Sequence, residues 1–140
     1  MLDLTNPKDA HTDERLRKDS IIWLSSVRPD GRPHLVPVWF LWDGETILIF
    51  SQPNAQKLRN LRQNTNVILA LDDTKDGDDV VMLEGKAELL NDPAVNPTLP
   101  AYVAKYDSQL KSMGYTAEAM AAEYTQAIRI TPTRFLNISG

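Results

Sequence analysis

Two Asp-Gly pairs, Asp30-Gly31 and Asp43-Gly44, constrain this chain more than any other feature of its sequence. Each pair follows a segment rich in β-branched and aromatic residues, and Asp-Gly readily supplies the positive φ angles of a tight hairpin turn. The pattern predicts an antiparallel meander of three consecutive strands: Ser20–Val27, His34–Trp42 and Thr46–Phe50.

Short helices and further strands are expected in the rest of the chain. The predicted helices are Thr12–Asp19 with Thr12 as N-cap, a helix capped by Asn54 that carries Leu58 and Leu61, Ala101–Tyr106 and Ala117–Glu123. The predicted strands are Asn66–Leu71, Val80–Leu90 and Ala127–Thr131, the last ended by Pro132. A mostly antiparallel β chain with helical decorations suits a small barrel. Because no linker or repeat interrupts the chain, we expect one domain over residues 1–140.

Composition excludes several classes of protein. The chain has 140 residues, 42% of them hydrophobic, and no apolar run approaches the ~20 residues that span a bilayer. The start of the chain is polar and charged, unlike a secretory signal, so we expect a cytoplasmic protein without membrane contact. The absence of cysteine excludes disulfide scaffolds and thiolate chemistry. A net charge of -4 and a pI near 5.1 argue against nucleic acid as a partner.

No motif for unaided catalysis is present. The sequence lacks a GxSxG elbow, an HExxH pair and a P-loop. The two histidines, His11 and His34, are interpreted as surface or strand-edge residues, and no metal ligands are expected. The acidic segment Asp72–Asp79 does not have the residue spacing of a calcium loop and is interpreted as a solvated hairpin loop. If the protein is an enzyme, a bound cofactor should supply its chemistry, and no catalytic residue is assigned.

One segment that could hold a cofactor runs from His34 to Phe40. Pro37 interrupts an otherwise strong strand, where it cannot donate a ladder hydrogen bond, so it marks a sheet edge or a bulge. Backbone groups there could read the polar edge of a flavin ring, and Trp39 and Phe40 add apolar area. The alternative is an edge strand whose proline only prevents aggregation.

A second candidate segment runs from Ser51 to Leu61 and contains a predicted helix N-terminus. Such a terminus favours an anion. Lys57 in the first turn borders the apolar stripe and could reach a phosphate, with Ser51 and Gln52 offering hydrogen bonds, whereas Arg59 points away. The alternative is that Lys57 is a solvated surface residue.

Together these segments carry a family resemblance. The run from Arg28 to Phe40, followed by Trp42-Asp-Gly44, Phe50-Ser51 and Lys57-Leu-Arg-Asn-Leu61, resembles the pyridoxamine 5'-phosphate oxidase-like FMN-binding split barrels. The branch described as deazaflavin-dependent is the most similar. The resemblance is strongest from Ile22 to Val67 and weak after Asn91.

This resemblance implies a mostly β, six-stranded antiparallel split barrel and a homodimer with flavin at the subunit interface. It implies that Val36, Pro37, Val38 and Trp39 line the flavin ring. It assigns the ribityl phosphate to Ser51, Gln52 and Lys57, and it suggests that Arg134 reaches the partner's cofactor. Relatives often carry a second basic residue two places before the helix lysine, where this chain has Ala55. That departure weakens the phosphate site unless Arg59 or a partner residue compensates.

The expected function is hydride transfer between FMN and a small-molecule substrate. One alternative keeps the fold but uses the 8-hydroxy-5-deazaflavin coenzyme, and a solvent-open basic groove beyond Lys57 would favour it. Another alternative is a flavin- or haem-binding module without turnover.

Overall fold

A single antiparallel sheet forms the centre of the structure, a computed structural model that describes residues 2–72 and 75–136. Its strands are β1 (Ile22–Val27), β2 (Pro33–Val38), β3 (Leu41–Trp42), β4 (Ile47–Ser51), β5 (Asn66–Leu71), β6 (Met82–Leu90) and β7 (Gln126–Leu136). The helices are α1 (Pro7–Lys18), α2 (Gln56–Gln63), α3 (Pro100–Ser112) and α4 (Ala117–Glu123). The strand order is β2-β1-β5-β6-β7-β4-β3.

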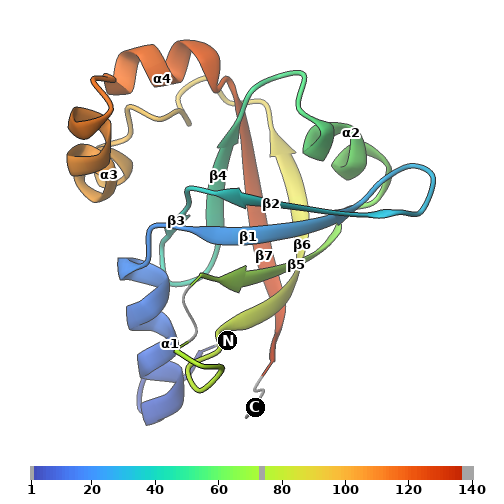
Figure 1. Ribbon diagram of the computed structural model, residues 1–140, viewed down its shortest axis with the longest axis vertical. Coiled ribbons are helices and arrows are strands. Elements are labelled where there is room, and N and C mark those ends of the chain that lie inside the picture. The colour runs from blue at the N-terminus through green and yellow to red at the C-terminus, as the bar shows by residue number, and fades with distance from the viewer. Residues whose placement is uncertain (1, 73–74, 137–140) are drawn as a thin grey trace.

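The order of the strands requires the sheet to curl. Strands β2 and β3 occupy opposite ends of the order, yet only Trp39 and Phe40 separate them in the chain. Since an extended residue spans at most ~3.6 Å, the two edges of the sheet must approach each other closely. Figure 1 shows the resulting half-barrel, in which β1 and β2 cross in front of β4, β6 and β7. This is the split-barrel architecture that the family resemblance implies.

The predicted three-strand meander is wrong, and so is the count of six strands. The segment His34–Trp42 is not one strand: it breaks at Trp39 and Phe40 into β2, which pairs with β1, and β3, which pairs with β4. Phe40 is fully buried in the barrel core at this break, which turns the chain from one sheet edge to the other. Two separate hairpins and seven strands result.

The last strand is longer than predicted because Pro132 does not end it. Strand β7 continues to Leu136, and Pro132 lies opposite Gly85, beside the shift in register between Glu84 and Gly85 on β6. A proline is tolerated at such an irregularity, where the ladder is already disrupted. An added Cβ at Gly85 would lie 2.8 Å from Ile130 Cγ2 and 3.0 Å from the Thr131 carbonyl oxygen, so a side chain there would force β7 to shift.

Two apolar clusters stabilise the fold. The larger fills the barrel and includes Leu16 of α1 and Leu58 and Leu61 of α2. The smaller joins α3 and α4 to the sheet through Tyr102, Tyr106, Leu110, Met120, Phe50 and Ala127. Figure 1 places α3 and α4 above one end of the barrel and α1 below the other. Helix α3 is twice the predicted length, whereas α4 has the predicted bounds.

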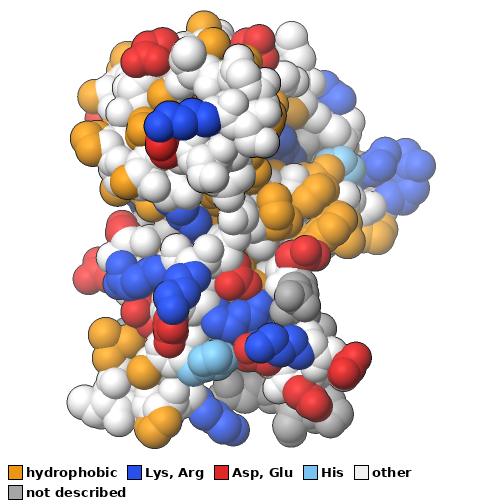
Figure 2. Space-filling model, turned by 60° about the vertical axis from the view of Figure 1, so that its left-hand side comes forward, with side chains coloured by type: hydrophobic (Ala, Val, Ile, Leu, Met, Phe, Trp, Pro, Cys, Tyr) orange, Lys and Arg blue, Asp and Glu red, His pale blue; other side chains and the backbone are white. Residues whose placement is uncertain are grey.

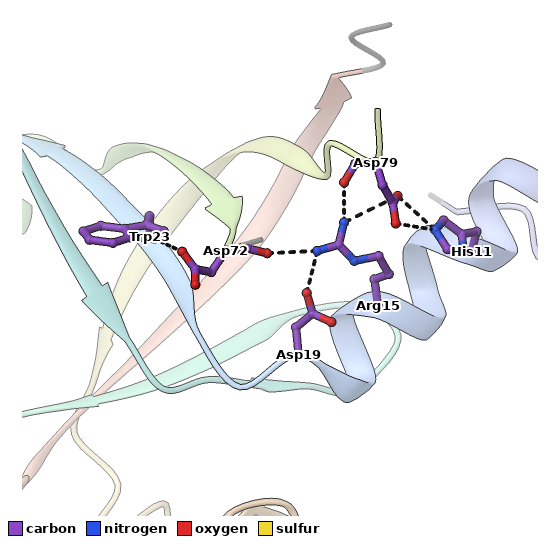
Figure 3. Close-up of polar contacts among 6 residues, drawn as sticks. All are labelled: His11, Arg15, Asp19, Trp23, Asp72 and Asp79. Carbon is purple, nitrogen blue, oxygen red and sulfur yellow. Dashed lines mark hydrogen bonds and ion pairs between the residues drawn. The ribbon is translucent and has the colours of Figure 1, made fainter. Parts of the chain in front are cut away.

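Helix α1 is fixed to the barrel by Arg15 (Figure 3). This helix starts earlier than predicted, since Asn6 rather than Thr12 is its N-cap. The buried Arg15 guanidinium donates to Asp19 Oδ2 at 2.6 Å and to the Asp72 carbonyl at 3.0 Å, and it also donates to the Asp79 carbonyl. The acidic loop is therefore held by α1 at both of its ends, and the hypothesis of a simply solvated loop is wrong for Asp72 and Asp79. Residues 73 and 74 of that loop lie outside the described residues.

Candidate functional site

A cavity of about 460 Å³ lies where the end of β2 meets β4, α2 and the α3–α4 pair. Its lining consists of Ile21, Pro37, Val38, Trp39, Phe50, Gln52, Lys57, Tyr102, Met113, Tyr115, Met120 and Tyr124. Most of these side chains are apolar or aromatic, and Lys57 is the only charged residue among them. A mostly apolar cavity with a few polar groups is typical of a small-molecule site.

Five of the eight predicted site residues line this cavity: Pro37, Val38, Trp39, Gln52 and Lys57. The other three do not. Val36 packs against the barrel core, and Ser51 is fully buried with its Oγ donating to the Gln52 carbonyl at 2.9 Å. Arg134 is exposed on β7, opposite Glu84.

Strand β2 provides one wall of the cavity and is an edge strand, as the proline predicts. Pro37 pairs with Trp23 of β1, so the other side of the β2 backbone faces no strand. At a sheet edge, unpaired N–H and C=O groups are available to a ligand. Beyond the end of the strand, the Trp39 ring stacks on Tyr106 with centroids 4.4 Å apart and an interplanar angle of 5°. The wall is therefore both apolar and fixed in place.

Lys57 lies on α2 with its side chain half-buried. Burial lowers the pKa of its ammonium group, and no hydrogen bond or ion pair joins it to another residue in the described part of the chain. Arg59, by contrast, is exposed, and its guanidinium donates to the Asn54 carbonyl at 2.9 Å and to Gln56 Oε1 at 2.6 Å. The two cations therefore face in different directions, and the one in the cavity lacks a counter-ion.

The start of α2 differs from the prediction in a way that favours an anion. Ala55, not Asn54, is the N-cap, and no side chain caps the helix. The Ala55 N–H donates to the Gln52 carbonyl at 3.3 Å, which sets the helix start one residue later than predicted. Uncapped N–H groups and the helix dipole both attract negative charge.

Two further residues, which the sequence reasoning missed, belong with Lys57 because the charges of Arg28 and Lys57 both act on His34. Arg28 follows β1 and His34 belongs to β2, and the buried atoms Arg28 Nε and His34 Nδ1 have no hydrogen-bond partner in the described structure. Burial, followed by the charges of Arg28 and Lys57, lowers the pKa of His34. These three residues form what we call the basic cluster. Buried polar atoms are normally paired, so the cluster is suited to an anionic ligand.

The basic cluster is held in position by a buried contact between α2 and β1. Asn60 Nδ2 donates to Ser26 Oγ at 2.9 Å, and both residues are almost completely buried. Ser26 pairs with His34 across the β1–β2 hairpin. The helix that carries Lys57 and the hairpin that carries Arg28 and His34 are thereby joined.

The aromatic side of the cavity comes from α3 and α4, to which the sequence reasoning gave no functional role. Tyr106 is bonded to the break between β2 and β3: its hydroxyl accepts from the Phe40 N–H at 2.8 Å and donates to the Ser20 carbonyl at 2.7 Å. Lys105 Nζ donates to the Phe40 carbonyl at 2.9 Å, and burial lowers its pKa to about 8. The only sequence signal for this wall is the number of tyrosines and methionines between Tyr102 and Tyr124.

The lining holds no pair of carboxylates and no histidine that could act as acid and base. Within residues 2–72 and 75–136, no three His, Asp or Glu side chains gather as a metal site. None of the described helices is long and apolar enough to cross a membrane. The site can thus bind a flat apolar group next to an anion, and a bound cofactor would have to supply any redox chemistry.

Comparison with known proteins agrees with this fold. An F420 reductase has a similar structure, with 26% sequence identity, a TM-score of 0.65 and coverage of 88% of this chain and 94% of that one. A conserved hypothetical protein of Mycobacterium tuberculosis is 24% identical with a TM-score of 0.70, covering 94% and 91% of the two chains. The heme storage protein HutZ of Vibrio cholerae shares the fold at 14% identity and a TM-score of 0.62, covering 94% and 92%.

No curated protein matches the sequence. The family model for pyridoxamine 5'-phosphate oxidase, however, matches residues 9–139, nearly the whole chain. Together with the seven-stranded split barrel, this match shows that the chain belongs to the pyridoxamine 5'-phosphate oxidase family.

Proposed function

We propose that this protein binds FMN and transfers hydride between the flavin and a small-molecule substrate. The observation that carries the proposal is the polarity of the site along β2. The basic cluster lies at the His34 end of the strand, and the apolar cavity lies at the Pro37–Trp39 end. At ~3.3 Å per residue, His34 and Pro37 are about 10 Å apart. A ligand with an anion at one end and a flat ring at the other matches this arrangement.

The residues present fit the two ends of FMN. The phosphate would lie at the basic cluster, where it would pair with Lys57 and satisfy the unpartnered nitrogens of Arg28 and His34. In this assignment Arg28 of the hairpin, rather than Arg59, would compensate for the absence of a basic residue at position 55. The ring would lie against Pro37, Val38 and Trp39, where the free edge of β2 offers backbone hydrogen bonds.

When bound, FMN would supply the site that accepts or donates hydride. The protein's own residues position the two reactants and keep water away. Trp39 and Phe50 provide apolar surface, and the stacking of Trp39 on Tyr106 keeps that surface rigid. Close positioning in a dry site contributes much of the rate of such a transfer.

A deazaflavin coenzyme is the second candidate for the cofactor. The specific observation in its favour is the 26% identity with an F420 reductase over most of both chains. Arg28 also extends the positive charge beyond Lys57, the condition under which an acidic coenzyme tail would be favoured. The ring and the phosphate would occupy the same positions in both cases.

The protein is further proposed to be a homodimer that pairs through the outer face of β1, β2 and β5. Leu35 is 60% exposed and Ile68 is 42% exposed, and both lie beside Ser25 on this face. Pro37 is also exposed here, so the face is continuous with the cavity. Figure 2 shows hydrophobic side chains gathered beside the β1–β2 hairpin, next to basic ones. A second copy would cover this surface and enclose the open side of the cavity.

Equilibrium titrations with FMN, the deazaflavin coenzyme and haem, followed by absorbance and fluorescence quenching, test the proposed function. We expect saturable binding of FMN at or below micromolar concentration. A lower dissociation constant for the deazaflavin coenzyme than for FMN would identify the deazaflavin as the cofactor. Failure of both flavins to saturate the protein would overturn the proposal. Saturation by haem alone would instead assign the fold to a haem-binding module.

A further inference from the structure

The phenol of Tyr102 is an unsatisfied polar group in the wall of the cavity. Its side chain is completely buried, its oxygen has no hydrogen-bond partner within the described residues, and the residue lines the cavity. Burying a hydroxyl without a partner costs free energy, and phenylalanine would fill the same space without that cost. An unpaired buried group of this kind calls for an explanation, and one explanation is a ligand.

Tyr106 shows that the lack of a partner is particular to Tyr102. It lies one helical turn further along α3, is equally buried, and has its hydroxyl bonded to backbone groups of Phe40 and Ser20. The helix therefore satisfies one buried phenol fully and leaves the other without a partner.

Burial, with the neighbouring Tyr106 and Tyr124, raises the pKa of Tyr102. The hydroxyl therefore keeps its proton at any physiological pH, and it meets a ligand as a neutral hydrogen-bond donor rather than as an acid. Its natural counterpart is an acceptor oxygen such as a carbonyl.

The surroundings of Tyr102 select the rest of the ligand. Phe50 packs edge-on against Tyr102 with centroids 4.9 Å apart, and Met113, Tyr115, Met120 and Tyr124 complete this side of the cavity. Aromatic rings and methionine sulfurs pack well against a flat ring. The only cation of the lining is Lys57, which the phosphate of the cofactor would occupy. A charged second ligand would therefore find no counter-ion among these residues.

We infer that Tyr102 is a specificity-determining residue, which donates a hydrogen bond to the acceptor oxygen of an uncharged, planar substrate held against the α3–α4 wall. The inference rests on the proposed function, since this substrate would be the partner of the flavin. It also implies that a phosphorylated amine is a poor substrate for this member of the family.

The test compares two probes and two variants by isothermal titration calorimetry, with and without saturating FMN. 1-Indanone is flat, uncharged and carries one carbonyl, whereas indane has the same frame without oxygen. We expect the protein to prefer 1-indanone by about three- to tenfold, the value of one neutral hydrogen bond. The Tyr102→Phe variant should lose this preference and bind indane as before. The matched control, Tyr106→Phe, should keep the preference.

Thermal unfolding provides the readout that separates recognition from structure. Tyr106→Phe should lower the melting temperature because two backbone partners are lost, whereas Tyr102→Phe should leave it unchanged or raise it. The inference is overturned if Tyr102→Phe keeps the preference for 1-indanone, if the wild type shows no such preference, or if the melting temperature of Tyr102→Phe falls like that of the control.

FMN titrations of the same proteins separate this inference from the proposed function. If FMN binds to the wild type but Tyr102→Phe fails to change the probe preference, the proposed function stands and the inference falls. If FMN does not bind but the probes behave as expected without it, the phenol site stands and the flavin proposal falls. A loss of FMN affinity in Tyr102→Phe with an unchanged probe preference would assign the phenol to the cofactor and overturn the inference.

Discussion

Replacing Lys57 by alanine should weaken FMN binding by about ten- to a hundredfold. The ammonium group is half-buried and has no counter-ion within the described chain, so a bound phosphate would be its partner. A charge-assisted hydrogen bond in such a setting is worth roughly 1.5–3 kcal/mol, between a solvent-exposed pair and a fully buried one. Each 1.4 kcal/mol is a factor of ten in the dissociation constant, which gives the expected range.

Riboflavin has the ring and the ribityl chain but no phosphate, so it tests whether the loss of FMN affinity comes from the phosphate contact. Dissociation constants for FMN and riboflavin, measured by flavin fluorescence on wild type and on Lys57→Ala, form a double-mutant cycle. The variant should bind riboflavin as the wild type does, because the phosphate contact is absent in both. Arg59→Ala is the matched control, since that guanidinium is exposed and bonded within its own helix region, and its FMN affinity should change less than threefold. The reasoning is refuted if Lys57→Ala weakens riboflavin and FMN equally, or if Arg59→Ala matches Lys57→Ala.

Three further predictions concern assembly and stability. Leu35→Asp places a charge on the exposed outer face, so light scattering should show a dimer for the wild type and a monomer for the variant. A wild-type mass of about 15.8 kDa, with and without FMN, would contradict the proposed interface. The pKa of Asp79 is lowered mainly by a hydrogen bond from His11 and also by the charge of Arg15. The contribution of this carboxylate to the free energy of unfolding is therefore complete above its unfolded pKa of about 3.9. It is lost as the pH falls through the lower pKa of the folded state. Urea denaturation should therefore show that the difference in free energy of unfolding between wild type and Asp79→Asn shrinks below about pH 3.9. A difference that grows below that pH would contradict the prediction. Gly85→Ala should lower the free energy of unfolding by about 1–3 kcal/mol because its Cβ would lie 2.8 Å from Ile130 Cγ2, and an unchanged denaturation midpoint would show that β7 moves aside.

Local sequence patterns predicted most of the elements but not how the first strands pair. The strand Asn66–Leu71 and the helix Ala117–Glu123 have the predicted bounds, because their residue preferences agree with their environments. The meander was predicted from two turns that do exist. The error came from the segment between them, where burial of Phe40 and the bonds of Tyr106 to it turn the chain across the barrel. Those contacts join residues far apart in the sequence, so no local pattern reports them.

The candidate site was predictable where it depends on strand and helix patterns and not where it depends on tertiary packing. Pro37 correctly predicted an edge strand, and the helical periodicity around Lys57 correctly separated it from Arg59. His34 was interpreted as an ordinary edge residue because its proximity to Lys57 arises only when α2 packs on β1. The α3–α4 wall was missed for the same reason, since it reaches the cavity from a distant part of the chain.

Phosphorus NMR of FMN bound to the protein tests the central claim most directly. The second ionisation of a phosphate monoester has a pKa of about 6 in water. If the phosphate lies at the basic cluster, Lys57 and Arg28 favour its dianion and lower that pKa, so the bound resonance should remain that of the dianion at pH values where free FMN is already half-protonated. A bound resonance that titrates near pH 6, as free FMN does, would place the phosphate in solvent and contradict the account.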